Sequence, residues 1–124
     1  ALLGILAQRL VRVICRTCIE PIEVAPALIA EIDNPGQDSI KAFHGKGCKE
    51  CNHTGFSGRA GIYELLVVDD TVRQLILTKA TSQIIRESAR KKGMTTLRED
   101  GWKKVAKGIT TVEEVLRVTL NEQT

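Results

Sequence analysis

The spacing of apolar residues divides the chain into segments of different periodicity. In residues 1–14 the apolar side chains recur at helical spacings with polar ones between them, which predicts a helix over 1–14. They are Leu3, Leu6, Ala7, Leu10, Val13 and Ile14, and Leu2 and Ile5 widen the arc. An arc this wide exceeds the need of a solvent-facing helix, so we expect the helix to pack inside a bigger domain. Because the pattern is already under way at Ala1, we interpret the chain as a fragment of a larger protein.

Three of the middle segments predict strands and one predicts a helix. A short strand is expected around Ile22 and Val24, a helix over 27–32 after Pro26, and a turn at 33–36. Lys41–His44 predicts another short strand. Residues 61–68 form a β-rich and nearly continuous apolar run, which is typical of a strand buried on both faces. The chain offers too few other strands to build a sheet around it, so we expect its neighbours in the missing domain.

From Asp69 onward the pattern predicts four short helices. Asp69 or Asp70 can cap the first helix, and Thr81 or Ser82 the second. Two capping boxes, Thr96-x-x-Glu99 and Thr111-x-x-Glu114, open the third and the fourth. The side chains expected to point inward are Val72, Leu75, Ile76, Ile84, Ile85, Ala89, Leu97, Trp102, Val105, Ala106, Val112, Val115, Leu116 and Val118. None of these helices would be stable alone in water, so we expect them to pack together as a small bundle.

All four cysteines of the chain lie in two C-x-x-C pairs, Cys15/Cys18 and Cys48/Cys51. In such a turn two sulfurs can face one tetrahedral ion at about 2.3 Å, and a second turn completes the shell. The pairs are further apart than in the usual zinc ribbon. However, each doubling of a loop costs only about 0.6 kcal/mol, which the binding energy of a metal covers. The spacing predicts a structural zinc site, because four thiolates leave no open position for water.

Other interpretations of the cysteines remain open at this point. One is a redox dithiol, which is normally a single C-x-x-C beside a βαβ unit. Another is a pair of structural disulfides, which would need an oxidising compartment, although nothing here resembles a signal peptide. His44 or His53 could replace a sulfur ligand, but a surface or hydrogen-bonding role fits both better because the four cysteines already complete the site.

Composition and charge narrow the class of partner. Aromatic residues make up 3% of the 124 residues, and the net charge is +3. Scarce stacking platforms and a mild charge argue against nucleic acid as the partner. Two basic clusters, Arg86/Arg90/Lys91/Lys92 and Arg98/Lys103/Lys104/Lys107, could touch phosphate or acidic partners, but a solvated helix face explains them better. No apolar run is long enough to predict a transmembrane segment, and zinc-binding thiols favour the cytoplasm.

The chain carries no recognisable catalytic motif. The phosphate loop G-x-x-x-x-G-K-[ST] does not occur, nor does G-x-G-x-x-G or G-x-S-x-G. We therefore assign no catalytic and no cofactor-binding residue, and whether the chain is an enzyme stays open.

Four stretches together resemble a known family. They are AQRLVR (7–12) leading into the first cysteine pair, GCKECNHTGFSGRAGIYELL (47–66), MTTLREDG (94–101) and KVAKGITTVEEVLRVT (104–119). They resemble the C-terminal part of the bacterial type II secretion ATPases and of the type IV pilus assembly ATPases, in the branch that carries a tetracysteine segment. The resemblance covers essentially the whole chain.

The resemblance implies a place in a larger machine. Such proteins are hexameric, RecA-like α/β motors at the cytoplasmic face of the inner membrane, where they drive assembly through a membrane platform protein. It implies that residues 1–14 are the terminal helix of an upstream nucleotide-binding domain and that 15–58 form a zinc subdomain with Cys15, Cys18, Cys48 and Cys51 as ligands. Residues 59–68 would return to the motor sheet, and 69–124 would be the C-terminal helical subdomain.

On this resemblance ATP and magnesium bind elsewhere in the parent protein. Arg9 or Arg12 could sense nucleotide across a subunit boundary, although a helix surface with salt bridges suits them better. The expected fold is mainly α with a small β component, in which a zinc-knuckle subdomain precedes a bundle of short helices. The expected function is to couple ATP hydrolysis to the inner-membrane platform. Two other classes remain, namely a stand-alone zinc module for protein or nucleic acid and a dithiol oxidoreductase.

Overall fold

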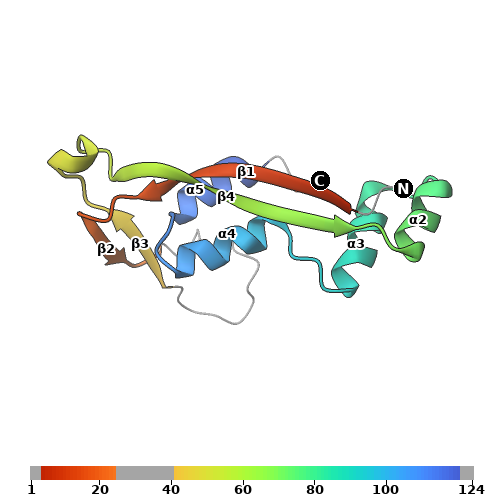
Figure 1. Cartoon of the computed structure of the whole chain (residues 1–124). Helices are drawn as coiled ribbons and strands as arrows, with labels where there is room; N and C mark the ends of the chain where they lie inside the picture. Colours follow the sequence, from red (N-terminus) through yellow and green to blue (C-terminus); the bar gives the residue numbers. More distant parts are fainter. Residues whose placement is uncertain (1–3, 25–40, 121–124) are drawn as a thin grey trace.

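Two antiparallel ribbons and four helices make up the chain in its computed structural model, which describes residues 4–24 and 41–120. The long ribbon pairs β1 (Gly4–Ile14) with β4 (Phe56–Val67), from Gly4↔Val67 to Ile14↔Phe56. The short ribbon pairs β2 (Ile19–Ile22) with β3 (Ala42–Gly45). Figure 1 shows the long ribbon running the length of the molecule, with the short ribbon and the 3₁₀ turn η1 (Lys49–Cys51) at one end.

The helix expected over residues 1–14 is wrong, because Gly4–Ile14 is strand β1. The helical spacing arose from Leu6 and Leu10, which turn outward and are 62% and 46% exposed. Val11, which did not belong to the helical pattern, is fully buried opposite Ala60. Both faces of β1 carry apolar residues, so the spacing of these residues fits a helix as well as a strand. Pairing with β4 therefore determines the conformation of this segment.

Strand β4 confirms the strand expected over residues 61–68, but it starts five residues earlier and is not buried on both faces. Ile62 is fully buried and Glu64 nearly so, whereas Tyr63, Leu65 and Val67 are 43–58% exposed. This alternation is that of a strand with one covered face. Its neighbour lies within the chain, contrary to expectation, because β1 pairs along almost its whole length.

The four expected helices are all present. They are α2 (Asp70–Leu77), α3 (Ser82–Lys91), α4 (Leu97–Ala106) and α5 (Val112–Thr119). Asp69, Thr81, Thr96 and Thr111 cap them by accepting backbone N–H bonds, as the sequence predicted. The capping box of α4 is confirmed, because the Glu99 carboxylate also accepts the backbone N–H of Thr96. In α5 only half of the box forms, because Arg12 and Arg117 take up the Glu114 carboxylate.

The helices do not form one bundle. Helices α4 and α5 pack against each other and against β1, β3 and β4. Helices α2 and α3 pair with each other at the end of the long ribbon that lies opposite the short ribbon (Figure 1). One buried cluster joins Ala42 of β3 to helices α4 and α5 through Val105, Val112, Val115 and Leu116. A second joins Val11, Ile62 and Leu97. Strands contribute more to this small α/β fold than the expected mainly-α class implied.

Two of the sequence predictions for the middle of the chain can be compared with the structure. Strands β2 and β3 confirm the short strands expected near Ile22 and over Lys41–His44. The helix expected over 27–32 and the turn at 33–36 lie outside the described residues.

Candidate metal centre

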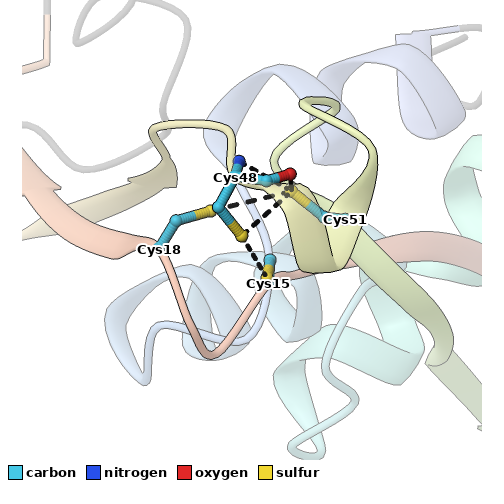
Figure 2. A group of neighbouring side chains, drawn as sticks. All are labelled: Cys15, Cys18, Cys48 and Cys51. Carbon is cyan, nitrogen blue, oxygen red and sulfur yellow. Dashed lines mark hydrogen bonds between the residues drawn. The ribbon is translucent and has the colours of Figure 1, made fainter.

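The two C-x-x-C pairs meet at the end of the molecule where both ribbons terminate. Cys15 directly follows β1 and Cys18 directly precedes β2. Cys48 is the N-cap of η1 and Cys51 is its last residue. Figure 2 shows the four side chains converging from these two turns. All four Sγ atoms lie within 4.8 Å of one another, so the fold brings together residues 33 positions apart in sequence.

The distances between the sulfurs fit a tetrahedral metal site. Cys15–Cys48 and Cys18–Cys51 are each 3.8 Å apart, and Cys48–Cys51 are 3.7 Å apart. A tetrahedron with a metal–sulfur distance of about 2.3 Å has edges of about 3.8 Å. A disulfide would bring two sulfurs to about 2.05 Å, and all four cysteines are free. The donor set and its spacing therefore suit zinc better than a disulfide pair.

Backbone N–H groups point at two of the sulfurs. Gly47 donates to Cys18 Sγ at 3.3 Å, and Cys51 Sγ accepts from Cys48 at 3.3 Å and from Gly55 at 3.2 Å. Such bonds stabilise thiolates and orient them, as the outer shell of a metal site does. They come from the tight turns that the glycines allow.

Gly55 ties the two cysteine pairs together. Its N–H donates to Cys51 Sγ, and its carbonyl accepts the N–H of Cys15 at 2.9 Å. Its φ of +82° is in the left-handed region, and a Cβ here would lie 2.5 Å from the carbonyl oxygen of Gly45. Both the backbone angle and the close approach therefore require glycine at this position.

Within the four-cysteine cluster, the pKa values of Cys51 and Cys18 shift in opposite directions. Burial alone would raise the pKa of Cys51, but the N–H groups of Cys48 and Gly55 outweigh it and lower that pKa to about 6. Burial and the neighbouring sulfurs raise the pKa of Cys18 to about 12. Four adjacent thiolates repel one another, and a divalent cation removes this repulsion.

Neither histidine joins the cluster. His44 Nε2 lies 2.7 Å from the Glu20 carboxylate across the short ribbon. His53 continues the second turn with a φ of +62°, and its N–H donates to the Cys48 carbonyl. Within residues 4–24 and 41–120, the group of side chains that could hold a metal contains only the four cysteines.

Arg12 and Glu114 form a contact that the sequence did not reveal. The Arg12 backbone N–H and guanidinium both donate to the Glu114 carboxylate, and the guanidinium also lies 4.2 Å from the centre of the Phe56 ring. Arg9, the other arginine considered, is exposed and donates to the Gln8 carbonyl. No periodicity or motif links Arg12 to a residue 102 positions away, so only the fold could show this pair.

Most side chains of the two basic clusters form ion pairs or hydrogen bonds with other residues of the chain. Their ion pairs are Arg86–Glu64, Arg90–Glu99, Lys92–Asp69 and Lys104–Asp100. The Arg98 side chain is buried and donates to Thr119. These contacts favour the interpretation of a structured helix surface over a phosphate-binding one. None of the helices in the described part of the chain is long and apolar enough to cross a membrane.

Fold and site together define a small α/β unit whose four-cysteine cluster can hold a metal ion. The model of a family described as type II/IV secretion system protein matches residues 1–117. The chain therefore belongs to the type II/IV secretion system protein family.

Relatives from several bacteria agree with this family. The chain is 45% identical over 122 residues to type II secretion system protein E of Pseudomonas aeruginosa, covering 98% of the chain and 24% of that protein. It is 43% identical over 122 residues to the type IV pilus assembly ATPase PilB of Thermus thermophilus, covering 97% of the chain and 14% of that protein. Type II secretion system ATPase E of Vibrio cholerae is 43% identical over 119 residues, covering 96% of the chain and 24% of that protein. The chain thus spans a quarter or less of these relatives.

Proposed function

We propose that the chain is the C-terminal zinc-binding and helical region of a hexameric ATPase that powers type II protein secretion or type IV pilus assembly. The proposal rests on one combined observation. Four sulfurs lie close enough to hold a metal ion, in a chain of which nearly the whole length matches secretion and pilus ATPases. In this proposal ATP and magnesium bind elsewhere in the parent protein. The region works at the cytoplasmic face of the inner membrane, where partner proteins hold it.

The long ribbon supports a place within a larger motor sheet. On its outer face Leu6, Leu65 and Val67 are 52–62% exposed, and in the described part of the chain β1 pairs only with β4. An apolar face and an unpaired strand edge of this kind invite a further layer and a further strand. We propose that the parent's RecA-like domain supplies both. Residues 59–68 then belong to its sheet, as does strand β1 (Gly4–Ile14).

The role of the metal in this proposal is structural. Zinc would be held by Cys15, Cys18, Cys48 and Cys51 and would supply a rigid cross-link between the end of β1 and η1. The backbone donors of Gly47, Cys48 and Gly55 keep the sulfurs oriented toward the ion. Within residues 15–58, the two cysteine turns and the short ribbon thereby become a stiff projection that contacts the membrane platform or a neighbouring subunit. The helical region 69–124 transmits the motion of the ring.

A cysteine variant of the full-length protein tests the proposal. Cys48→Ser removes one ligand from η1, and His53→Asn changes an exposed side chain of the same turn but keeps a residue that tolerates its positive φ. Zinc content is measured by atomic emission, and secretion or piliation is measured in a strain that carries each variant. We expect Cys48→Ser to lose the zinc and the transport, and His53→Asn to keep both.

Two results would contradict the proposal in different ways. A wild-type protein purified without zinc, and unable to take it up, would remove the metal assignment. Full secretion or piliation by a zinc-free Cys48→Ser protein would leave the metal projection without an essential role in transport.

A further inference from the structure

The loop between α4 and α5 is bonded to the strand end that presents the first cysteine. Ile14 donates its N–H to the Ile109 carbonyl at 2.9 Å, and the Thr110 hydroxyl donates to the Arg12 carbonyl at 2.7 Å. The Arg16 guanidinium, inside the first C-x-x-C turn, reaches the carbonyl of Gly108. Three successive loop residues thus hold alternate residues of the segment 12–16.

Of the residues that make these bonds, Ile14 and Thr110 lie in the interior, whereas Arg16 is exposed. Ile14 and Thr110 are fully buried, and Cys15 is 3% exposed. A buried polar group that loses its partner bears its full desolvation cost, so the loop and the strand end are strongly held to each other. On the other side, the N–H of Cys15 is held by the Gly55 carbonyl. The backbone of Cys15 is therefore fixed from two directions, by the second cysteine turn and by the α4–α5 loop.

We propose that residues 108–110 are positioning residues of the metal centre and that metal loading and the packing of the α4–α5 loop are coupled. The inference rests on the proposed zinc role of the four sulfurs. The three loop bonds described above go to Arg12, Ile14 and Arg16 and not to a sulfur. The α4–α5 loop fixes the backbone at the end of β1 and thereby the direction in which the Cys15 side chain points. In this way the loop contributes to the preorganisation of the site.

Coupling between two sites is reciprocal in free energy. If the loop helps to place Cys15 for the metal, then the bound metal must hold the loop in place to the same extent. The metal therefore protects the start of α5 as well as the two cysteine turns.

The test compares two buried threonines in the full-length protein. Thr110→Val removes the hydroxyl that donates to Arg12 and keeps the volume of the side chain. Thr119→Val is the matched control, because Thr119 is 1% exposed and its hydroxyl has no bond to the segment 12–16: it donates to the Val115 carbonyl at 2.6 Å and accepts from the buried Arg98 at 3.1 Å. Zinc affinity is measured by competition with a chromogenic chelator.

We expect Thr110→Val to bind one zinc ion per chain about tenfold more weakly than wild type, which is the lower range for the loss of an outer-shell partner. Thr119→Val keeps the wild-type affinity, and Thr110→Ser, which retains the hydroxyl, restores most of it. Arg16→Gln, at an exposed position, provides a second variant that also binds zinc more weakly even if Thr110→Val fails to fold.

Hydrogen exchange of the wild-type protein gives a readout that needs no variant. On adding zinc to the metal-free protein, we expect the amides of residues 108–112 to gain protection along with those of the cysteine turns. Equal zinc affinity of wild type, Thr110→Val and Arg16→Gln, or protection confined to the cysteine turns, would overturn this inference alone. A wild-type protein that binds no zinc would overturn the proposed function as well.

Discussion

Glu114 is a buried carboxylate that joins strand β1 to helix α5, and its replacement by glutamine is a sharp test of this fold. Its side chain is 2% exposed. It accepts the Arg12 backbone N–H at 2.9 Å, the Arg12 guanidinium at 3.0 and 2.8 Å, and the Arg117 guanidinium at 3.0 and 2.8 Å. Glu114→Gln keeps the shape, removes the charge and turns an amide NH₂ toward groups that can only donate.

The size of the effect follows from the pKa of Glu114. Burial alone would raise this pKa, but Arg117 and Arg12 outweigh it and lower the pKa from 4.5 to about 2. At about 1.36 kcal/mol per pKa unit this corresponds to about 3 kcal/mol of stability. Because the two arginine side chains are 51% and 57% exposed, water screens them, and we expect a loss of about 2–3 kcal/mol.

The sign of the pH dependence follows from the lowered pKa. The folded pKa lies below the unfolded one, so the stabilisation is fully present above about pH 4.5 and is lost as the pH falls toward 2. We expect the stability gap between wild type and Glu114→Gln to be constant from pH 5 to 7. Near pH 3.5 it should have narrowed by roughly 1 kcal/mol.

Urea unfolding at several pH values measures this gap. Both proteins are studied with zinc chelated, so that acid release of the metal does not enter the comparison. Glu113→Gln is the matched control, because Glu113 is the exposed neighbour in the same helix turn. A gap at pH 7 no larger than that of Glu113→Gln, or one that widens on acidification, would refute this reasoning.

Three further substitutions test the packing. Gly55→Ala would place a Cβ 2.5 Å from the Gly45 carbonyl oxygen at a φ of +82°, so zinc content should fall sharply, and unchanged zinc content would contradict this. Gly101→Ala would bring a Cβ to 2.6 Å from Val115 Cγ1, and overpacking should cost about 1–3 kcal/mol in urea unfolding; a stabilised protein would contradict it. Ile62→Ala removes a fully buried side chain and should cost about 2–5 kcal/mol by the same method, with a loss below 1 kcal/mol as the contrary result.

The four-cysteine cluster could be predicted from the sequence because its geometry is mostly local. A C-x-x-C turn presents two sulfurs on the same side whatever the rest of the fold does, and two such turns need only be brought together. The helix caps are local in the same sense, since Thr96 and Thr111 bond to backbone groups within three residues. These features therefore appeared in the structure as the sequence indicated.

The remaining features depend on partners that are distant in sequence. Strand β1 has apolar residues on both faces, so its spacing also matched a helix, and only the pairing with β4 settled its conformation. Glu114 occupies the right position for a capping box, but Arg12, 102 residues away, competes for its carboxylate. A charge-assisted bond to a buried carboxylate is stronger than a neutral one to a backbone N–H, so the long-range partner prevails.

Residues of the proposed metal subdomain and of the helical region share one buried cluster. Ala42 of β3 packs in the same buried cluster as Val105 and Val112. A cysteine variant would therefore disturb α4 and α5 as well as the metal end. Its loss of transport would not by itself distinguish a contact surface from a scaffold, so a surface variant is needed that leaves the cluster intact.

Lys49 and Glu50 offer that variant, because both are exposed on η1 at the tip of the metal end. The double reversal Lys49→Glu with Glu50→Lys keeps the net charge and the four sulfurs. Since the proposed projection contacts a partner, we expect zinc content and urea stability to remain at wild-type levels while secretion or piliation falls. Lys91→Glu is the control, being exposed on α3 at the opposite end of the long ribbon (Figure 1). Undiminished transport in the double variant would mean that the metal end acts only as a scaffold for α4 and α5.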